Sequence, residues 1–230
     1  MPADFTQFIT TNLYYIVSAV LSLGVLIGIS MMSKVKTARL GNGLSALCML
    51  VAIAVVFVHY EIVPVYLVWA GLGIGLLIGI ILTVRVDMIS MPQTVALLNG
   101  LGGAASAVVG LLTLLSKGVG GGRFELITAA IAVVVGSVTF SGSLIAAGKL
   151  HRVLKQQPVV LPLHQLWTML CLLLSIAFIA FFAFAPQKYL ESYLIIASIA
   201  GTAISLIFGI VFAIRVGGAD MPITISLLNS

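Results

Sequence analysis

Residues 126–138 read LITAAIAVVVGSV, and this stretch decides the class of fold. A membrane β-strand would alternate polar and apolar residues over about ten positions. Here the side chains are apolar on every side of the segment, which favours a membrane-embedded α-helix. The composition agrees, because 61% of the residues are hydrophobic, only 7% are charged, and the mean hydropathy is +1.27. The sequence therefore predicts an all-α, polytopic membrane protein.

The apolar runs define the predicted membrane spans. A hydrocarbon core of about 30 Å requires roughly 20 apolar residues for each helical crossing. Runs between charged or Pro/Gly-rich breaks predict seven complete spans, near residues 13–32, 40–58, 62–84, 92–116, 124–148, 164–185 and 190–214. An eighth begins at Pro222, and the remaining stretch of about nine residues, 222–230, is too short to cross. We expect a single transmembrane domain over residues 1–230 that is part of a longer polypeptide.

Basic residues predict the orientation of the spans. Eight of the eleven Lys and Arg residues fall on one side of this topology, namely Lys34, Lys36, Arg39, Arg85, Lys149, Arg152, Lys155 and Arg215. Because Lys and Arg near span ends are retained in the cytoplasm, the N-terminus is expected outside. A cytoplasmic domain downstream would then require a ninth span. Basic residues in short loops of this kind indicate the orientation of the spans and do not form a groove for a polyanion. The expected surroundings are therefore lipid and not nucleic acid.

An internal repeat relates two parts of the chain. Residues 67–100 recur without gaps as residues 197–230, and the clearest matches lie in the second half of each copy. These matches pair Arg85, Val86, Met91, Pro92, Thr94, Leu97, Leu98 and Asn99 with Arg215, Val216, Met221, Pro222, Thr224, Leu227, Leu228 and Asn229. The copies are four spans apart, so both cross in the same direction. Parallel repeats of this kind occur in transporters.

The repeat places two asparagines at matched positions. Each follows its proline by seven residues, which puts Asn99 and Asn229 about 10 Å below the inner surface. An amide in hydrocarbon must find partners, so it either joins helices or lines a polar path. Asp220, directly before Met221-Pro222, suits an N-cap and is also placed for a proton path. The two asparagines and Asp220 are therefore candidate proton-path residues.

Hydroxyl-bearing and small residues gather in the fifth span. Ser137, Thr139, Ser141 and Ser143 lie among glycines in its inner half. Close helix contact explains them, as it does the glycines at 71, 75 and 79 and those at 100, 102 and 103. The three histidines lie at span ends or in loops. Since no catalytic set, metal-ligand cluster or cofactor motif is recognisable, we expect no catalytic residue, metal or bound cofactor in this chain.

Three groups of motifs together carry a family resemblance. They are Gly217-Gly-Ala-Asp-Met-Pro followed by Ser226-Leu-Leu-Asn-Ser, then Val138-Thr-Phe-Ser-Gly-Ser with Gly148-Lys-Leu, and Met91-Pro with Val95-Ala. Through them the whole chain resembles the membrane domain of the β subunit of proton-translocating NAD(P) transhydrogenase. The resemblance implies that inward proton movement drives hydride transfer from NADH to NADP⁺. It also implies a bacterial-type inner membrane.

The resemblance places the chemistry in other domains. It implies an NADP(H)-binding domain after the ninth span, an NAD(H)-binding domain on a partner α subunit with its own transmembrane helices, and a homodimer of the αβ unit. By the same resemblance, Asn229 and Asp220 match positions tied to proton movement, and Ser143 matches a polar position facing the path. Arg215, Gly217 and Gly218 belong to the connecting loop implied in coupling.

One departure from some relatives concerns Asn99, which stands where they have a histidine. Asparagine does not titrate. Our hypothesis is that Asn99 and Asn229 orient water beside a histidine supplied by the α subunit, whose ordinary pKa is about 6.5. Two alternatives stay open at this point: a stand-alone secondary transporter with a solute site between the two Asn helices, and a structural anchor subunit.

Overall fold

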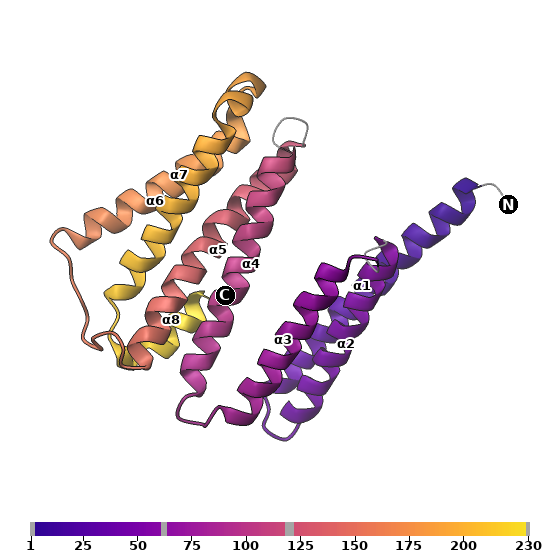
Figure 1. Ribbon diagram of the computed structural model, residues 1–230, viewed down its shortest axis with the longest axis horizontal. Helices are drawn as coiled ribbons and strands as arrows, with labels where there is room; N and C mark the ends of the chain where they lie inside the picture. The colour runs from indigo at the N-terminus through magenta and orange to yellow at the C-terminus, as the bar shows by residue number, and fades with distance from the viewer. Residues whose placement is uncertain (1–2, 61–63, 118–121, 229–230) are drawn as a thin grey trace. The chain divides into compact units, whose positions relative to one another are not determined.

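The computed structural model describes residues 3–60, 64–117 and 122–228, and these residues fold into helices, with a longer connection at residues 151–163 (Figure 1). The elements, in chain order, are α1 (Ala3–Met32), α2 (Ala38–His59), α3 (Tyr66–Arg85), α4 (Met91–Lys117), α5 (Arg123–Leu150), α6 (His164–Phe184), α7 (Gln187–Ile214), η1 (Gly218–Asp220) and α8 (Met221–Leu228). Within this part of the chain, α1 to α7 are long and apolar enough to cross a membrane. The prediction of an all-α membrane bundle is confirmed.

The helix bounds follow the predicted spans to within about four residues, except at the start of the first helix, and a smaller difference at the end of the fifth also matters. The first helix begins at Ala3 rather than at residue 13, because a polar segment can extend a helix beyond the apolar run that marks the span. The fifth ends at Leu150 rather than at residue 148, so Lys149 is a helical residue and not the loop residue that the sequence suggested. The chain divides into two compact units, residues 1–81 and 82–230, each described by itself.

The first unit contains an antiparallel pair, α1 and α2, that packs through small residues. A Cβ atom added to Gly28 would lie 2.8 Å from the carbonyl oxygen of Gly41, so the two backbones approach closely at this point. The hydroxyl of Thr37 donates to the carbonyl of Met31 at 2.7 Å and closes the connection. At the other end of the pair, the rings of Tyr14 and His59 stack with centroids 3.9 Å apart.

Within the first unit, the glycines of α3 at 71, 75 and 79 do not make the close helix contact that their spacing suggests. All residues of α3 are described and none of them is buried. A Cβ atom added to Gly71, Gly75 or Gly79 would meet no atom within 4 Å in the described structure. The spacing of small residues shows where a helix permits close approach, but it does not show that a neighbour is there.

In the second unit, α5 is the central helix. In an apolar stretch of 18 residues of α5, 61% of the residues are buried. The corresponding share is 33% or less in each of the other six long helices. An apolar cluster that includes Leu126, Val133, Phe178 and Phe182 packs α5 with α4, α6 and α7. A second cluster joins α5 to α4 and α8 at the opposite end, and consists of Ala96, Ala146, Ala147, Met221 and Ile225. Within residues 126–138, Ile131 and Val135 stay exposed, so this segment is apolar on its exposed face as well as on its buried one, as expected of a helix surrounded by lipid.

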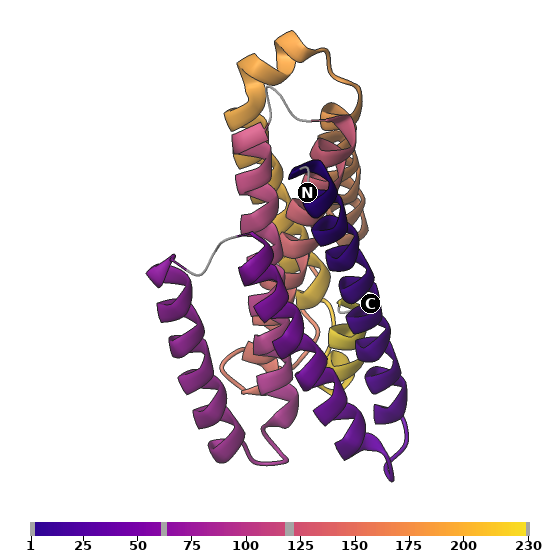
Figure 2. The same cartoon turned by 90° about the vertical axis from the view of Figure 1, so that its right-hand side faces the viewer.

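In the two copies of the repeat, the second helix begins at the same position. Both α4 and α8 begin at the methionine of a Met-Pro pair, Met91 and Met221, and proline suits the first turn because its missing N–H has no partner there. The helix before each pair ends at or next to the matching arginine, Arg85 or Arg215. Figure 2 shows η1 and α8 in yellow at the end of the unit opposite the orange α6–α7 connection.

Candidate functional site

The site begins with the close packing of α4 against α5. A Cβ atom added to Gly103 would lie 2.8 Å from the carbonyl oxygen of Gly136, and one added to Gly136 would lie 2.6 Å from the backbone nitrogen of Ala107. No real Cβ atom fits at such distances, so glycine at both positions allows the two backbones to touch. This contact brings the polar residues of α4 within reach of those of α5.

Asn99 and Ser143 form the first polar contact of the site. The Asn99 Nδ2 donates a hydrogen bond of 3.0 Å to Ser143 Oγ. Ser143 is fully buried and Asn99 is half-buried. The bond uses one donor of the amide, which leaves the Asn99 Oδ1 as an acceptor and the Ser143 hydroxyl proton as a donor. The pair can therefore continue a hydrogen-bonded chain in both directions.

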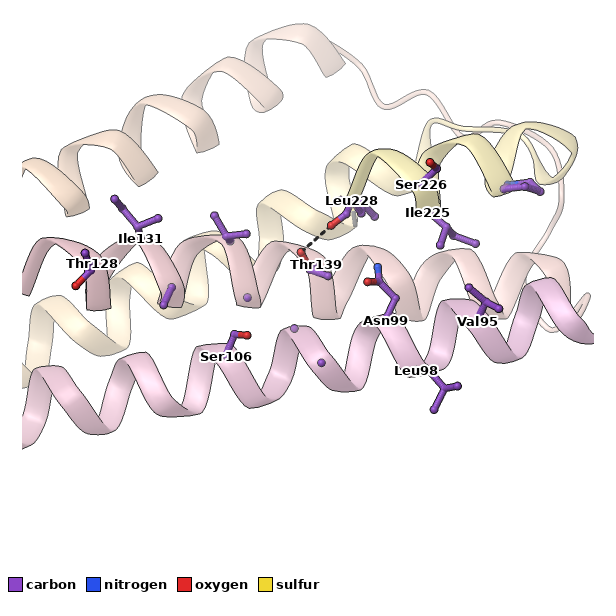
Figure 3. Close-up of a pocket in the computed structure, with 16 residues that line it drawn as sticks. Val95, Leu98, Asn99, Ser106, Thr128, Ile131, Thr139, Ile225, Ser226 and Leu228 are labelled. Carbon is purple, nitrogen blue, oxygen red and sulfur yellow. Dashed lines mark hydrogen bonds between the residues drawn. The ribbon is translucent and has the colours of Figure 1, made fainter. Parts of the chain in front are cut away.

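Thr139 connects α5 to the end of α8. Its hydroxyl donates to the carbonyl oxygen of Leu228 at 3.3 Å. Gly142, one turn further along α5, would bring an added Cβ atom to 3.0 Å from Leu228 Cδ1. Leu228 is therefore held against α5 at the level of Thr139. Figure 3 shows this bond beside Asn99, which is directed from α4 toward α5 and α8, whereas Leu98 points away.

Asn99, Thr139 and Leu228 line one cavity between α4, α5 and α8 of about 1000 Å³. Further polar residues of its wall are Ser106 on α4, Thr128 on α5 and Ser226 on α8. Ser106 follows Asn99 by seven residues, which places it about 10 Å further along the helix axis. A water molecule occupies about 30 Å³ in the liquid, so the cavity has room for a chain of waters between these levels.

The other predicted site residues lie in the connection between α7 and α8. Arg215 is the exposed C-terminal cap of α7, and Asp220 is exposed directly before α8. The Gly218 N–H donates to the carbonyl of Gln156 at 2.8 Å, and the Thr224 hydroxyl donates to the carbonyl of Asp220 at 3.3 Å. Gly217 precedes η1 and lies beside Pro158.

The structure thus brings Asn99 and Ser143 together and groups Arg215, Gly217, Gly218 and Asp220 at the entry to α8. Asn229 lies outside the described residues, so its predicted depth and its pairing with Asn99 stay predictions. Within the described residues, no group of three or more His, Cys, Asp and Glu side chains is placed to hold a metal ion.

Two residues have contacts that the sequence did not predict. Thr139, which the sequence suggests for helix packing alone, also lines the cavity and donates to α8. Lys149 was counted as a loop charge, yet it is fully buried in α5. Its sequence signal is periodicity, because Gly142, Ala146 and Lys149 follow the i, i+4, i+7 spacing of one buried helix face.

Comparison with known proteins identifies the family of this chain. The family described as NAD(P) transhydrogenase beta subunit matches residues 11–230. The NAD(P) transhydrogenase subunit beta of Rhodospirillum rubrum is 33% identical over 223 residues, and the same subunit from a defined strain of that species has the same identity over the same length. The alignment covers 94% of this chain and 46% of the relative, so the chain spans about half the length of these relatives. This chain belongs to the NAD(P) transhydrogenase beta subunit family.

Proposed function

We propose that this chain is the proton-translocating membrane domain of an NAD(P) transhydrogenase. In this proposal, inward proton movement through the chain is coupled to hydride transfer from NADH to NADP⁺ in partner soluble domains. The observation that carries the proposal is the hydrogen bond to the buried Ser143 from Asn99, which lines the cavity between α4, α5 and α8. Family membership favours this function over a stand-alone secondary transporter.

The residues of the cavity act by orienting water. Neither an asparagine amide nor a serine or threonine hydroxyl changes charge near neutral pH, so these groups carry no proton by titration. They hold water molecules in a hydrogen-bonded order along which a proton passes. The apolar cluster around Val133 and Phe182 lies on one side of this polar level, and the cluster around Met221 and Ile225 lies on the other. Both exclude water elsewhere and confine the path to the cavity.

The second asparagine and a partner complete the proposed path. Asn229 follows Leu228, whose carbonyl accepts the Thr139 hydrogen bond in the cavity wall, and this neighbourhood supports a role for Asn229 beside Asn99. The titrating group is then a histidine of the α subunit, because an imidazole changes charge near physiological pH. Its protonation and release move one proton past the two amides.

Coupling is proposed to run through the connection before α8. Arg215, Gly217, Gly218 and Asp220 occupy it, and it leads directly into the helix that lines the cavity. The NADP(H) site belongs to a soluble domain following a further span, and the NAD(H) site belongs to the α subunit. The working unit is a homodimer of αβ in a bacterial-type inner membrane, with the N-terminus of this chain outside.

The test replaces both amides in the complete complex. We expect Asn99→Leu combined with Asn229→Leu to reduce proton translocation into vesicles by more than about tenfold, because losing the oriented hydrogen bonds breaks the water chain. Asn42→Leu is the matched control, since it makes the same chemical change at an exposed position of α2 in the other unit. Proton translocation at the wild-type rate in the double variant would refute the assignment.

A further inference from the structure

Lys149 is a buried cation that the proposed path does not use. It lies in the last turn of a membrane-spanning helix, where a lysine side chain usually extends to the membrane surface, yet only 1% of its surface is exposed. Burying an ammonium group is costly unless hydrogen bonds replace its water. The Nζ atom donates to the carbonyl oxygens of Ile214 at 2.5 Å, of Val216 at 2.7 Å and, more weakly, of Gln157 at 3.4 Å. All three acceptors belong to the backbone.

These acceptors belong to two chain segments that Lys149 holds together. Residues 214–220, here called the hinge, run from the end of α7 to the start of α8, and residues 156–159, here called the strap, lie in the α5–α6 connection. The last carbonyls of a helix have no intrahelical partner, so a cation is favourable there. The strap adds two backbone bonds, from the Val159 N–H to Ile214 O at 3.1 Å and from the Gly218 N–H to Gln156 O at 2.8 Å.

The hinge sets the position of α8. Met221, the first residue of α8, is fully buried against the cluster of small residues on α4 and α5. Seven residues later, about 10 Å along the axis, Leu228 accepts the Thr139 hydrogen bond in the cavity wall. A short helix fixed at its start and contacted at its end moves as one rod. A change at the hinge therefore reaches the level of Asn99.

We infer that Lys149 is a positioning residue that locks the hinge and thereby couples the residues around Asp220 to the proton path. The inference rests on the proposed function. Without the ammonium group, the Val216 carbonyl loses its Lys149 donor, and the Ile214 carbonyl keeps only the bond from the Val159 N–H. Water or a different backbone conformation then replaces the ammonium group, and α8 loses its defined position. Hydride transfer in the soluble domains continues, but fewer protons move for each hydride transferred.

The test compares three variants in vesicles that contain the complete complex, with hydride transfer and proton movement recorded together. Lys149→Met is expected to lower the number of protons moved per hydride by about tenfold, the effect of losing a charge-assisted hydrogen bond. Lys155→Met removes the same charge from an exposed position nearby, and its ratio stays within about twofold of wild type. A lesion that merely lowers the amount of folded complex reduces both activities and leaves their ratio unchanged.

Lys149→Arg is the third variant, because it keeps a cation that donates to the same carbonyls and so favours assembly. It should retain more than about half of the wild-type ratio. Hydrogen exchange gives an independent measurement: in Lys149→Met the hinge amides exchange about tenfold faster, while those of α6 do not change. The inference would be overturned by a Lys149→Met complex that moves as many protons per hydride as wild type. It would also be overturned by a Lys149→Arg complex that assembles and transfers hydride but moves no protons. Failure of the proposed function looks different, since wild-type vesicles would then transfer hydride without moving protons.

Discussion

At the residue scale, one hydrogen bond joins two helices at the candidate site. An amide within a bilayer needs a partner, and Asn99 finds one in Ser143 on the neighbouring helix. The sequence left two roles open for this asparagine, helix contact and polar path. The structure shows that the two are compatible, because the bond joins α4 to α5 while the remaining acceptor of the amide lies at a cavity.

Ser143→Ala tests the bond from the other side. The change leaves one donor of the Asn99 amide without its acceptor, and we expect proton translocation to fall by about tenfold in assembled complex. Ser137→Ala is the control, because the buried Ser137 Oγ has no hydrogen-bond partner in the described structure. That variant should translocate protons at the wild-type rate. Equal effects from the two serines would show that packing, and not the bond to Asn99, is what matters.

At the scale of the helices, the sequence predicted the spans but not their neighbours. Long apolar runs give the number and bounds of the helices because bilayer thickness sets their length. Which helices pack together depends on how well their surfaces fit one another, and the sequence of one helix does not show the surface of its neighbour. Gly103 therefore meets α5, whereas the equally suggestive glycines of α3 meet no described atom within 4 Å.

The misassignment of Lys149 has the same origin. A lysine at the end of an apolar run usually extends to the membrane surface, so its charge was read as a topology signal. Only the carbonyls at the end of α7, more than sixty residues away in the chain, make its burial favourable. The contact between Asn99 and Ser143 could not be predicted for a similar reason, since it requires the relative rotation of two helices.

Gly136→Ala tests the close approach of α4 and α5. The added methyl group would overlap the α4 backbone near Ala107, and overpacking of this kind costs roughly 1–3 kcal/mol. We expect a lower thermal unfolding midpoint in detergent together with weakened proton translocation, because α4 must move away from Ser143. Gly102→Ala is the control on the facing helix, where an added Cβ atom meets no described atom within 4 Å. If both variants unfold at the wild-type temperature, the proposed contact is not a tight one.

At the scale of the whole molecule, the candidate site belongs to one of the two units. The cavity, the Asn99–Ser143 bond, the hinge and the strap all lie in residues 82–230. The family resemblance read from three groups of motifs is confirmed by the match over residues 11–230. The soluble domains and the α subunit belong to the proposal, because the relatives are about twice as long as this chain.

The most direct test of the central claim is to locate water in the complete complex by electron cryomicroscopy at a resolution that shows ordered water. The account predicts waters in the cavity between α4, α5 and α8, within hydrogen-bonding distance of the side chains of both Asn99 and Asn229, and continuing toward Ser106. A cavity filled by apolar side chains or lipid, with the two amides directed away from each other, would contradict it.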